Sequence, residues 1–259
     1  MDELNRKALA RDKYVALVGD SVFDNKAYVP AGHDVQNAVY RWRDYAESNM
    51  AYLAAVDGAV MKDVAAQPES PEVMKANKIY ISIGGNDLLR YSMALENLEP
   101  SVYDLYEVRE KFRAEYRANV IDLLVDRNSG KHIYNIRRGA NYAKPVTLCT
   151  IYIPKMILTN EQQVAEVAVS LVNDVIITEA GRVGLQVLEL RNVMSMPEHF
   201  TMEIEPSMHG SDAIAQAIEA HTSFKPDAYV LPNWPRYNLG RGTLHKAHSC
   251  SMCMEGRNT

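Results

Sequence analysis

Three short motifs place a hydroxyl group, a glycine amide and an asparagine side chain directly after predicted strands. Ser21 ends a Gly-Asp-Ser tripeptide, Gly58 lies in an Asp-Gly-Ala run, and Asn86 follows two glycines. Open α/β folds carry their reactive groups at the carboxyl ends of parallel strands. One Gly-Asp-Ser tripeptide alone would more often be a turn in which serine caps a helix. Three such strand ends together indicate one polar site.

The elements that must position these residues alternate along the chain. Apolar runs of strand length alternate with longer segments of helical period, which is typical of βα units around a parallel sheet. The runs are almost continuously apolar, as strands covered on both faces are. They are Tyr14–Val18, Tyr52–Val56, Ile79–Ile83, Val146–Tyr152 and Leu185–Leu190. We therefore expect an α/β fold with a mostly parallel central sheet sandwiched between helices, a flavodoxin-like three-layer arrangement.

Three segments have the spacing of amphipathic helices. Apolar residues keep roughly one face over residues 105–124, and a cleaner stripe begins at Val164 and continues at steps of three and four. A last helix is predicted over Ser211–His221, with Gly210 to Asp212 as its capping region. The first two segments are therefore predicted to be amphipathic helices.

Composition excludes several classes of protein. The chain has 259 residues, 47% of them hydrophobic, and 28 basic residues against 33 acidic ones give a net charge of -5. This charge balance lacks the excess of basic residues typical of a nucleic-acid-binding protein. No apolar run approaches the length of a membrane span. Three cysteines cannot form a disulfide framework, and the charged N-terminus lacks the apolar core of a signal peptide. We therefore expect a cytoplasmic protein that binds neither nucleic acid nor membrane.

The domain organisation is predicted from where the alternation stops. Residues 1–224 should form one α/β domain, interrupted by a basic insertion at residues 129–145. Residues 225–259 keep no strand or helix period and should form an extended C-terminal arm. The arm carries Trp234, Arg236 and Tyr237, which are residue types that anchor interfaces, so it is a candidate docking segment for a protein partner.

The end of the arm holds four side chains of the types that bind zinc. They are His245, His248, Cys250 and Cys253. Structural zinc sites normally join two ligand pairs across a longer loop, so a site made of these nine residues would be cramped. A flexible tail or a redox-active cysteine pair explains the same residues. We therefore predict no metal and no cofactor.

The three strand-end motifs and their order resemble the SGNH, or GDSL-type, family of serine esterases and lipases. The resemblance covers residues 14–218, because residues 204–210 are similar to the family's final block before its closing helix. It implies an acyl-ester hydrolase acting on a small carboxylic or acetyl ester. Carried over to this chain, Ser21 would be the nucleophile, and the amides of Ser21 and Gly58 with the side chain of Asn86 would bind the oxyanion.

The final block departs from the family pattern. In the family it reads Asp-x-x-His followed by proline, where the histidine is the base and the aspartate orients it. Here Glu205 precedes Pro206, and Met202 stands in place of the aspartate. His199 and His209 are the nearest histidines, and neither follows an aspartate by three residues. The family's triad therefore cannot be drawn on this chain.

Three alternatives follow for the missing base. Glu205 could serve as a carboxylate base if burial raised its pKa, with Glu203 supplying a like charge. His209 or His199 could instead reach Ser21 from a shifted position. In the third alternative the protein is a catalytically silent relative that serves as a structural or accessory subunit of a larger assembly, docked through the arm or the basic insertion.

Overall fold

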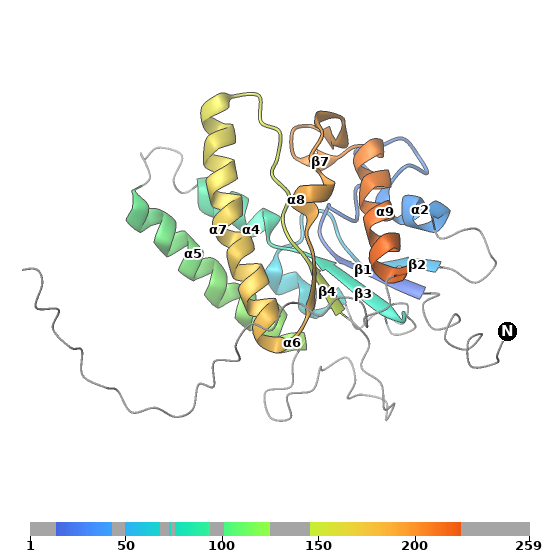
Figure 1. Cartoon of the computed structure of the whole chain (residues 1–259), viewed down its shortest axis with the longest axis horizontal. Coiled ribbons are helices and arrows are strands. Elements are labelled where there is room, and N and C mark those ends of the chain that lie inside the picture. The colour runs from blue at the N-terminus through green and yellow to red at the C-terminus, as the bar shows by residue number, and fades with distance from the viewer. Residues whose placement is uncertain are drawn as a thin grey trace, which may run out of the picture. The chain divides into compact units, whose positions relative to one another are not determined.

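Five parallel strands form the central sheet, in the order β2-β1-β3-β4-β5 (Figure 1). The computed structural model describes residues 14–42, 50–67, 73, 76–93, 101–124 and 146–223. The strands are β1 (Tyr14–Gly19), β2 (Met50–Leu53), β3 (Lys78–Ser82), β4 (Val146–Cys149) and β5 (Gln186–Leu188). The predicted basic insertion and the predicted C-terminal arm both lie outside the described residues.

Helices cover both faces of this sheet, so the predicted three-layer α/β fold is confirmed. Helices α2 and α9 pack together on one face, and α5 and α7 pack together on the other (Figure 1). The helices are α2 (Val35–Trp42), α4 (Gly85–Met93), α5 (Val102–Tyr116), α6 (Asp122–Leu124), α7 (Thr159–Val183), α8 (Leu190–Val193) and α9 (Met208–Ser223). Short 3-10 helices span Met61–Ala65 and Pro197–His199, a π-helical turn spans Arg117–Ile121, and β6 (Phe200–Thr201) pairs antiparallel with β7 (Glu205–Pro206).

Two hydrophobic clusters lie on opposite faces of the sheet. In β1, Ala16 and Val18 belong to the cluster under α5 and α7, whereas Val15 and Leu17 belong to the cluster under α2 and α9. Successive side chains of a strand point to opposite faces, so a strand with helices on both sides is apolar at most of its positions. This explains the continuous apolar runs in the sequence.

Strands β2 and β4 each end three residues earlier than their apolar runs predict, and a local contact accounts for each. After β2, Ala54 and Ala55 both donate backbone hydrogen bonds to the carbonyl of Leu17, which is a bulge that interrupts the ladder. After β4, the side chain of Asn173 accepts from the amide of Ile151 and donates to its carbonyl, replacing a neighbouring strand. Side-chain and bulge contacts of this kind leave no periodic signal.

The expected stripe on α7 is wrong at its start. Val164 is 49% exposed, whereas Val175, further along the expected stripe, is buried, as are Val169, Val172 and Ile176. The first turns of this 25-residue helix carry too little covering structure to bury their apolar side chains. Helix α9 also begins earlier than predicted, and Ser207 caps it by accepting a hydrogen bond from the Gly210 amide.

A buried carboxylate joins α5 to α7. Glu179 is 3% exposed and accepts two hydrogen bonds of 2.7 Å from the guanidinium of Arg117, the first residue of the π-helical turn. Arg182 lies 3.3 Å from the same carboxylate. A fork-shaped pair of this kind fixes the geometry of the contact and also strengthens it.

None of the helices in the described ranges is long and apolar enough to cross a membrane.

Candidate active site

Gly19 brings the end of β1 against the end of β3. Its φ of 132° lies in the region that favours glycine, and an added Cβ would fall 1.7 Å from the carbonyl oxygen of Ser82. The side chain of Gln67 accepts from the Gly19 amide at 2.7 Å and donates to its carbonyl at 2.8 Å. The next amide, that of Asp20, donates to Ser82 at 3.1 Å. These contacts fix the turn that carries Ser21.

The turn with Gly58 and the start of α4 are tied to the same point. Val56 donates to the carbonyl of Gly19 at 3.0 Å, and Gly58 follows with a φ of 76°. Asn86 Nδ2 donates to the carbonyl of Ala59 at 2.9 Å, which uses one of its two N–H groups. The three predicted strand ends therefore lie together at the carboxyl edge of the sheet.

The structure gives the Ser21 hydroxyl a carboxylate partner. Ser21 Oγ donates to Glu205 Oε1 across 3.3 Å, and the two residues lie 184 positions apart in the sequence. Ser21 is 8% exposed and Glu205 is 9% exposed. The distance is long for a hydrogen bond between oxygens, and catalytic hydrogen bonds are often this loose before substrate binds.

The environment of Glu205 makes its carboxylate more basic. Burial raises its pKa above the usual value of 4.5, the hydrogen bond from Ser21 opposes this, and the nearby charge of Asp57 raises it further. The second oxygen, Oε2, is buried and accepts no hydrogen bond from the described residues. A carboxylate with one unsatisfied oxygen holds its negative charge poorly and therefore takes up a proton more readily.

The expected role of Glu203 is not the one observed. Its carboxylate accepts a hydrogen bond of 2.7 Å from the amide of Ile157, and its backbone has a φ of 67°. The like charge near Glu205 is Asp57, which follows β2. Glu203 therefore holds the turn before β7 against the segment that precedes α7.

Asp20, the residue before the candidate nucleophile, is a buried carboxyl group that sequence reasoning did not single out. Burial raises its pKa to about 8, the amide hydrogen bond from Val22 lowers it, and the charges of Glu205 and Asp87 raise it. Its Oδ2 lies 3.9 Å from where a Cβ on Gly85 would be. At neutral pH this carboxyl is therefore mostly protonated beside the residue that precedes Asn86.

The two histidines near the final block are not hydrogen-bonded to Ser21. The ring of His199 accepts from the amide of Met196 at 3.4 Å. His209 is exposed in the first turn of α9. Among the described residues, Glu205 is therefore the titratable side chain that is hydrogen-bonded to Ser21 Oγ.

Asn25 links the nucleophile segment to the segment of the base, and no local signal in the sequence indicates this. It is fully buried, and its Nδ2 donates to the carbonyl of Pro206 at 3.0 Å and to Ser211 Oγ at 2.8 Å. Its Oδ1 accepts from the Val35 amide at the start of α2. Tyr152 supports the same segment by donating to the carbonyl of Ile204 at 2.7 Å.

The amides expected to hold an oxyanion are available. Within the described ranges, neither the Ser21 amide nor the Gly58 amide donates a hydrogen bond to a protein group. The second N–H of Asn86 is also unused. Three N–H groups from three strand ends therefore have no acceptor among the described residues.

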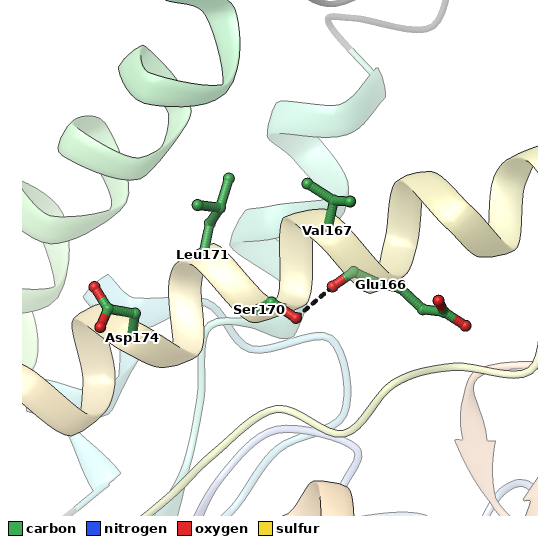
Figure 2. A pocket seen from close by; sticks show the side chains of 5 residues that line it. All are labelled: Glu166, Val167, Ser170, Leu171 and Asp174. Atoms are coloured by element: carbon green, nitrogen blue, oxygen red, sulfur yellow. Dashed lines mark hydrogen bonds between the residues drawn. The ribbon is translucent and has the colours of Figure 1, made fainter. Parts of the chain in front are cut away.

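A shallow hollow along the outer face of α7 is separate from this site. It has a volume of about 400 Å³, and Figure 2 shows its lining residues on successive turns of the helix. They are Glu166, Val167, Ser170, Leu171 and Asp174, and the hydroxyl of Ser170 is occupied by the Glu166 carbonyl at 2.7 Å. The hollow offers no free nucleophile.

No family model matches the sequence, and no curated protein matches it. Solved structures do match the fold. A lipase from a goat rumen metagenome is 19% identical, with a TM-score of 0.60 over 82% of this chain and 98% of that one. An acetyl xylan esterase is 18% identical, with a TM-score of 0.55 over 80% and 98%. A member of the lipolytic G-D-S-L family from Veillonella parvula is 14% identical, with a TM-score of 0.52 over 82% and 99%. The chain has the fold of these lipolytic hydrolases.

Proposed function

We propose that this chain, which has the fold of the G-D-S-L lipolytic hydrolases, is a serine acyl-ester hydrolase whose general base is Glu205. The observation that carries the proposal is the hydrogen bond from Ser21 Oγ to Glu205 Oε1. The substrate would be a small carboxylic or acetyl ester. No cofactor is needed, because a serine, a base and oxyanion donors are sufficient for ester hydrolysis.

In the first half of the reaction, Ser21 Oγ attacks the ester carbonyl carbon while its proton passes to Glu205. The carbonyl oxygen becomes an oxyanion held by the amides of Ser21 and Gly58 and the side chain of Asn86. When the tetrahedral intermediate collapses, the bond to the alcohol oxygen breaks and Glu205 returns the proton to the leaving alcohol. An acyl group then remains on Ser21.

In the second half, water replaces the alcohol. Glu205 takes a proton from the water as it attacks the acyl carbon, and the same three donors hold the second oxyanion. Collapse then breaks the bond to Ser21 Oγ, which recovers its proton from Glu205 and releases the carboxylic acid. Glu205 thus acts as base and acid in each half, which requires a pKa near the working pH. The raised pKa of Glu205 supports this role.

A fluorophosphonate probe tests the proposal. We expect the probe to label Ser21, as shown by peptide mapping, and the Ser21→Ala variant to remain unlabelled. The nucleophile attacks the probe's phosphorus as it would attack an ester carbon, so labelling requires an activated serine. Labelling of another residue, or none at high probe concentration with the protein folded, would contradict the proposed chemistry.

A second candidate function is favoured by the burial of the nucleophile. With Ser21 only 8% exposed, a substrate has little direct access to it. A catalytically silent protein that acts as an accessory subunit would need no such access. Native size in cell extract separates the two candidates, because a docked subunit would migrate with a large complex and a free enzyme would migrate as the chain of 259 residues alone.

The rate should depend on pH through two carboxyl groups. Glu205 must be ionised to act as base, so activity is lost as pH falls through its pKa, which lies above 4.5. Asp20 ionises as pH rises through about 8 and places negative charge beside Gly85, next to the oxyanion donors. We expect a bell-shaped profile of kcat/KM. In Asp20→Asn the alkaline decline should disappear while the acidic decline stays; an unchanged alkaline limb would rule out this role for Asp20.

A further inference from the structure

We infer that a pocket behind the oxyanion donors, lined by Lys62, Arg90, Lys111 and Tyr91, is a binding site for a phosphate group. The pocket has a volume of about 290 Å³ and is also lined by Asp87 and Glu115, among other residues. It contains neither Ser21 nor Glu205 and is therefore distinct from the site of ester hydrolysis. The binding inference does not depend on the proposed function.

Three cationic side chains reach this pocket from three separate elements. Lys62 comes from the 3-10 helix after Gly58, Arg90 from α4 and Lys111 from α5. Within the described part of the chain, neither Lys62 nor Arg90 forms an ion pair or a hydrogen bond. Lys111 Nζ lies 4.4 Å from the centre of the Tyr91 ring, a cation–π contact that leaves its N–H groups able to donate. These cations form a locally basic region in a chain whose net charge is -5.

Both carboxyl groups of the pocket already accept a hydrogen bond. Glu115 accepts a hydrogen bond of 2.6 Å from the Tyr91 hydroxyl. Asp87 is buried, and its Oδ2 accepts from the Met61 amide at 3.0 Å. Burial also raises the pKa of Asp87, which favours its neutral form. The pocket therefore has three cationic side chains against two carboxyl groups, each of which already accepts a hydrogen bond.

Phosphate fits these cations better than a carboxylate does. A carboxylate carries one charge and pairs with a single guanidinium, whereas a phosphate group carries up to two charges and has oxygens that point in different directions. Three cations from three directions match the second geometry. Tyr91 and Val60 offer an apolar wall for the organic part of a phosphate ester.

The pocket shares its inner wall with the oxyanion donors. Two hydrogen bonds join α4 to the segment after Gly58: Asn86 Nδ2 to the Ala59 carbonyl, and the Met61 amide to Asp87. Val60, between Ala59 and Met61, lines the pocket. A bound phosphate would therefore lie against the segment that follows Gly58 and the helix that carries Asn86. Any resulting effect on hydrolysis rests on the proposed function.

Nuclear magnetic resonance of the ¹⁵N-labelled full chain tests the binding site without using activity. Inorganic phosphate and pyrophosphate are titrated at constant ionic strength, with chloride as the reference anion. We expect the Met61 amide and the Asn86 side-chain amide to shift along one saturable curve at concentrations on the order of 10 mM or below. Arg90→Gln and Lys111→Gln should each weaken binding about tenfold. Arg182→Gln, which removes an exposed cation on α7, should leave it unchanged.

The two sources of a phosphate group are separated with vesicles. Retention on phosphatidate vesicles but not on phosphatidylcholine vesicles, with loss of retention in Arg90→Gln, would identify a lipid headgroup. A saturable phosphate titration without vesicle retention would identify a soluble phosphate ester. Shifts that do not saturate, or an Arg182→Gln variant that weakens binding as much as Arg90→Gln, would overturn the inference. Thermal melts of the variants show whether a loss of binding reflects unfolding.

Discussion

Replacing Glu205 with glutamine should reduce kcat/KM for ester hydrolysis by about 10²–10⁴-fold, the usual range for loss of a general base. Glutamine has the same shape but no basic oxygen, so it cannot take the Ser21 proton. The hydrogen bond of 3.3 Å would be lost as a path for the proton while the surrounding packing stays the same. Steady-state hydrolysis of a chromogenic acetyl ester measures the effect, and residual activity would report the oxyanion donors alone.

His209→Asn is the matched control for this substitution. His209 is exposed and lies four residues after Glu205, so its loss should leave hydrolysis unchanged. If His209→Asn reduces the rate and Glu205→Gln does not, the base is the histidine and the carboxylate dyad is wrong. If both variants keep full activity while Ser21→Ala loses it, neither Glu205 nor His209 is the base.

A Gly19→Ala substitution should lower the free energy of unfolding by at least about 3 kcal/mol. The added Cβ would lie 1.7 Å from the Ser82 carbonyl oxygen, and that oxygen cannot move without breaking its hydrogen bond with the Asp20 amide. The φ of 132° adds backbone strain for any residue with a side chain. Urea denaturation followed by circular dichroism measures the loss.

Gly181→Ala provides the comparison, because Gly181 lies in α7 with no atom within 4 Å of an added Cβ. Alanine favours helix over glycine, so this variant should be more stable by about 0.5–1 kcal/mol. Equal stability of Gly19→Ala and Gly181→Ala would show that the end of β1 can adjust, and the tight approach of β1 to β3 would then not constrain the Ser21 turn.

Much of the fold could be predicted because helices on both faces force a simple pattern on the strands. Strand β1 and strand β3 each end within one residue of their predicted apolar runs. The candidate nucleophile and oxyanion donors follow these ends directly. Their neighbourhood in space therefore follows from parallel strand order alone.

The rest of the site depends on contacts between distant residues that have no local pattern. Gln67 binds both backbone groups of Gly19 across 48 positions, and Asn25 binds the Pro206 carbonyl across 181 positions. A buried glutamine or asparagine can form hydrogen bonds with many different groups, so the residue type does not predict which partner it binds. The expected like charge on Glu203 failed for the same reason, because hydrogen bonding to Ile157 turns that side chain elsewhere.

The hydrogen bonds of Asn25 make the position of Glu205 relative to Ser21 depend on how α9 packs. Its fully buried side-chain amide donates to the Pro206 carbonyl, beside Glu205, and to Ser211 Oγ in the first turn of α9. Its oxygen accepts from the Val35 amide at the start of α2. Movement of α9 would break these hydrogen bonds and let the Glu205 carboxylate move away from Ser21 Oγ, while the parallel sheet stayed intact. The hydrogen bond between Ser21 and Glu205 should therefore persist only while α9 stays packed in place.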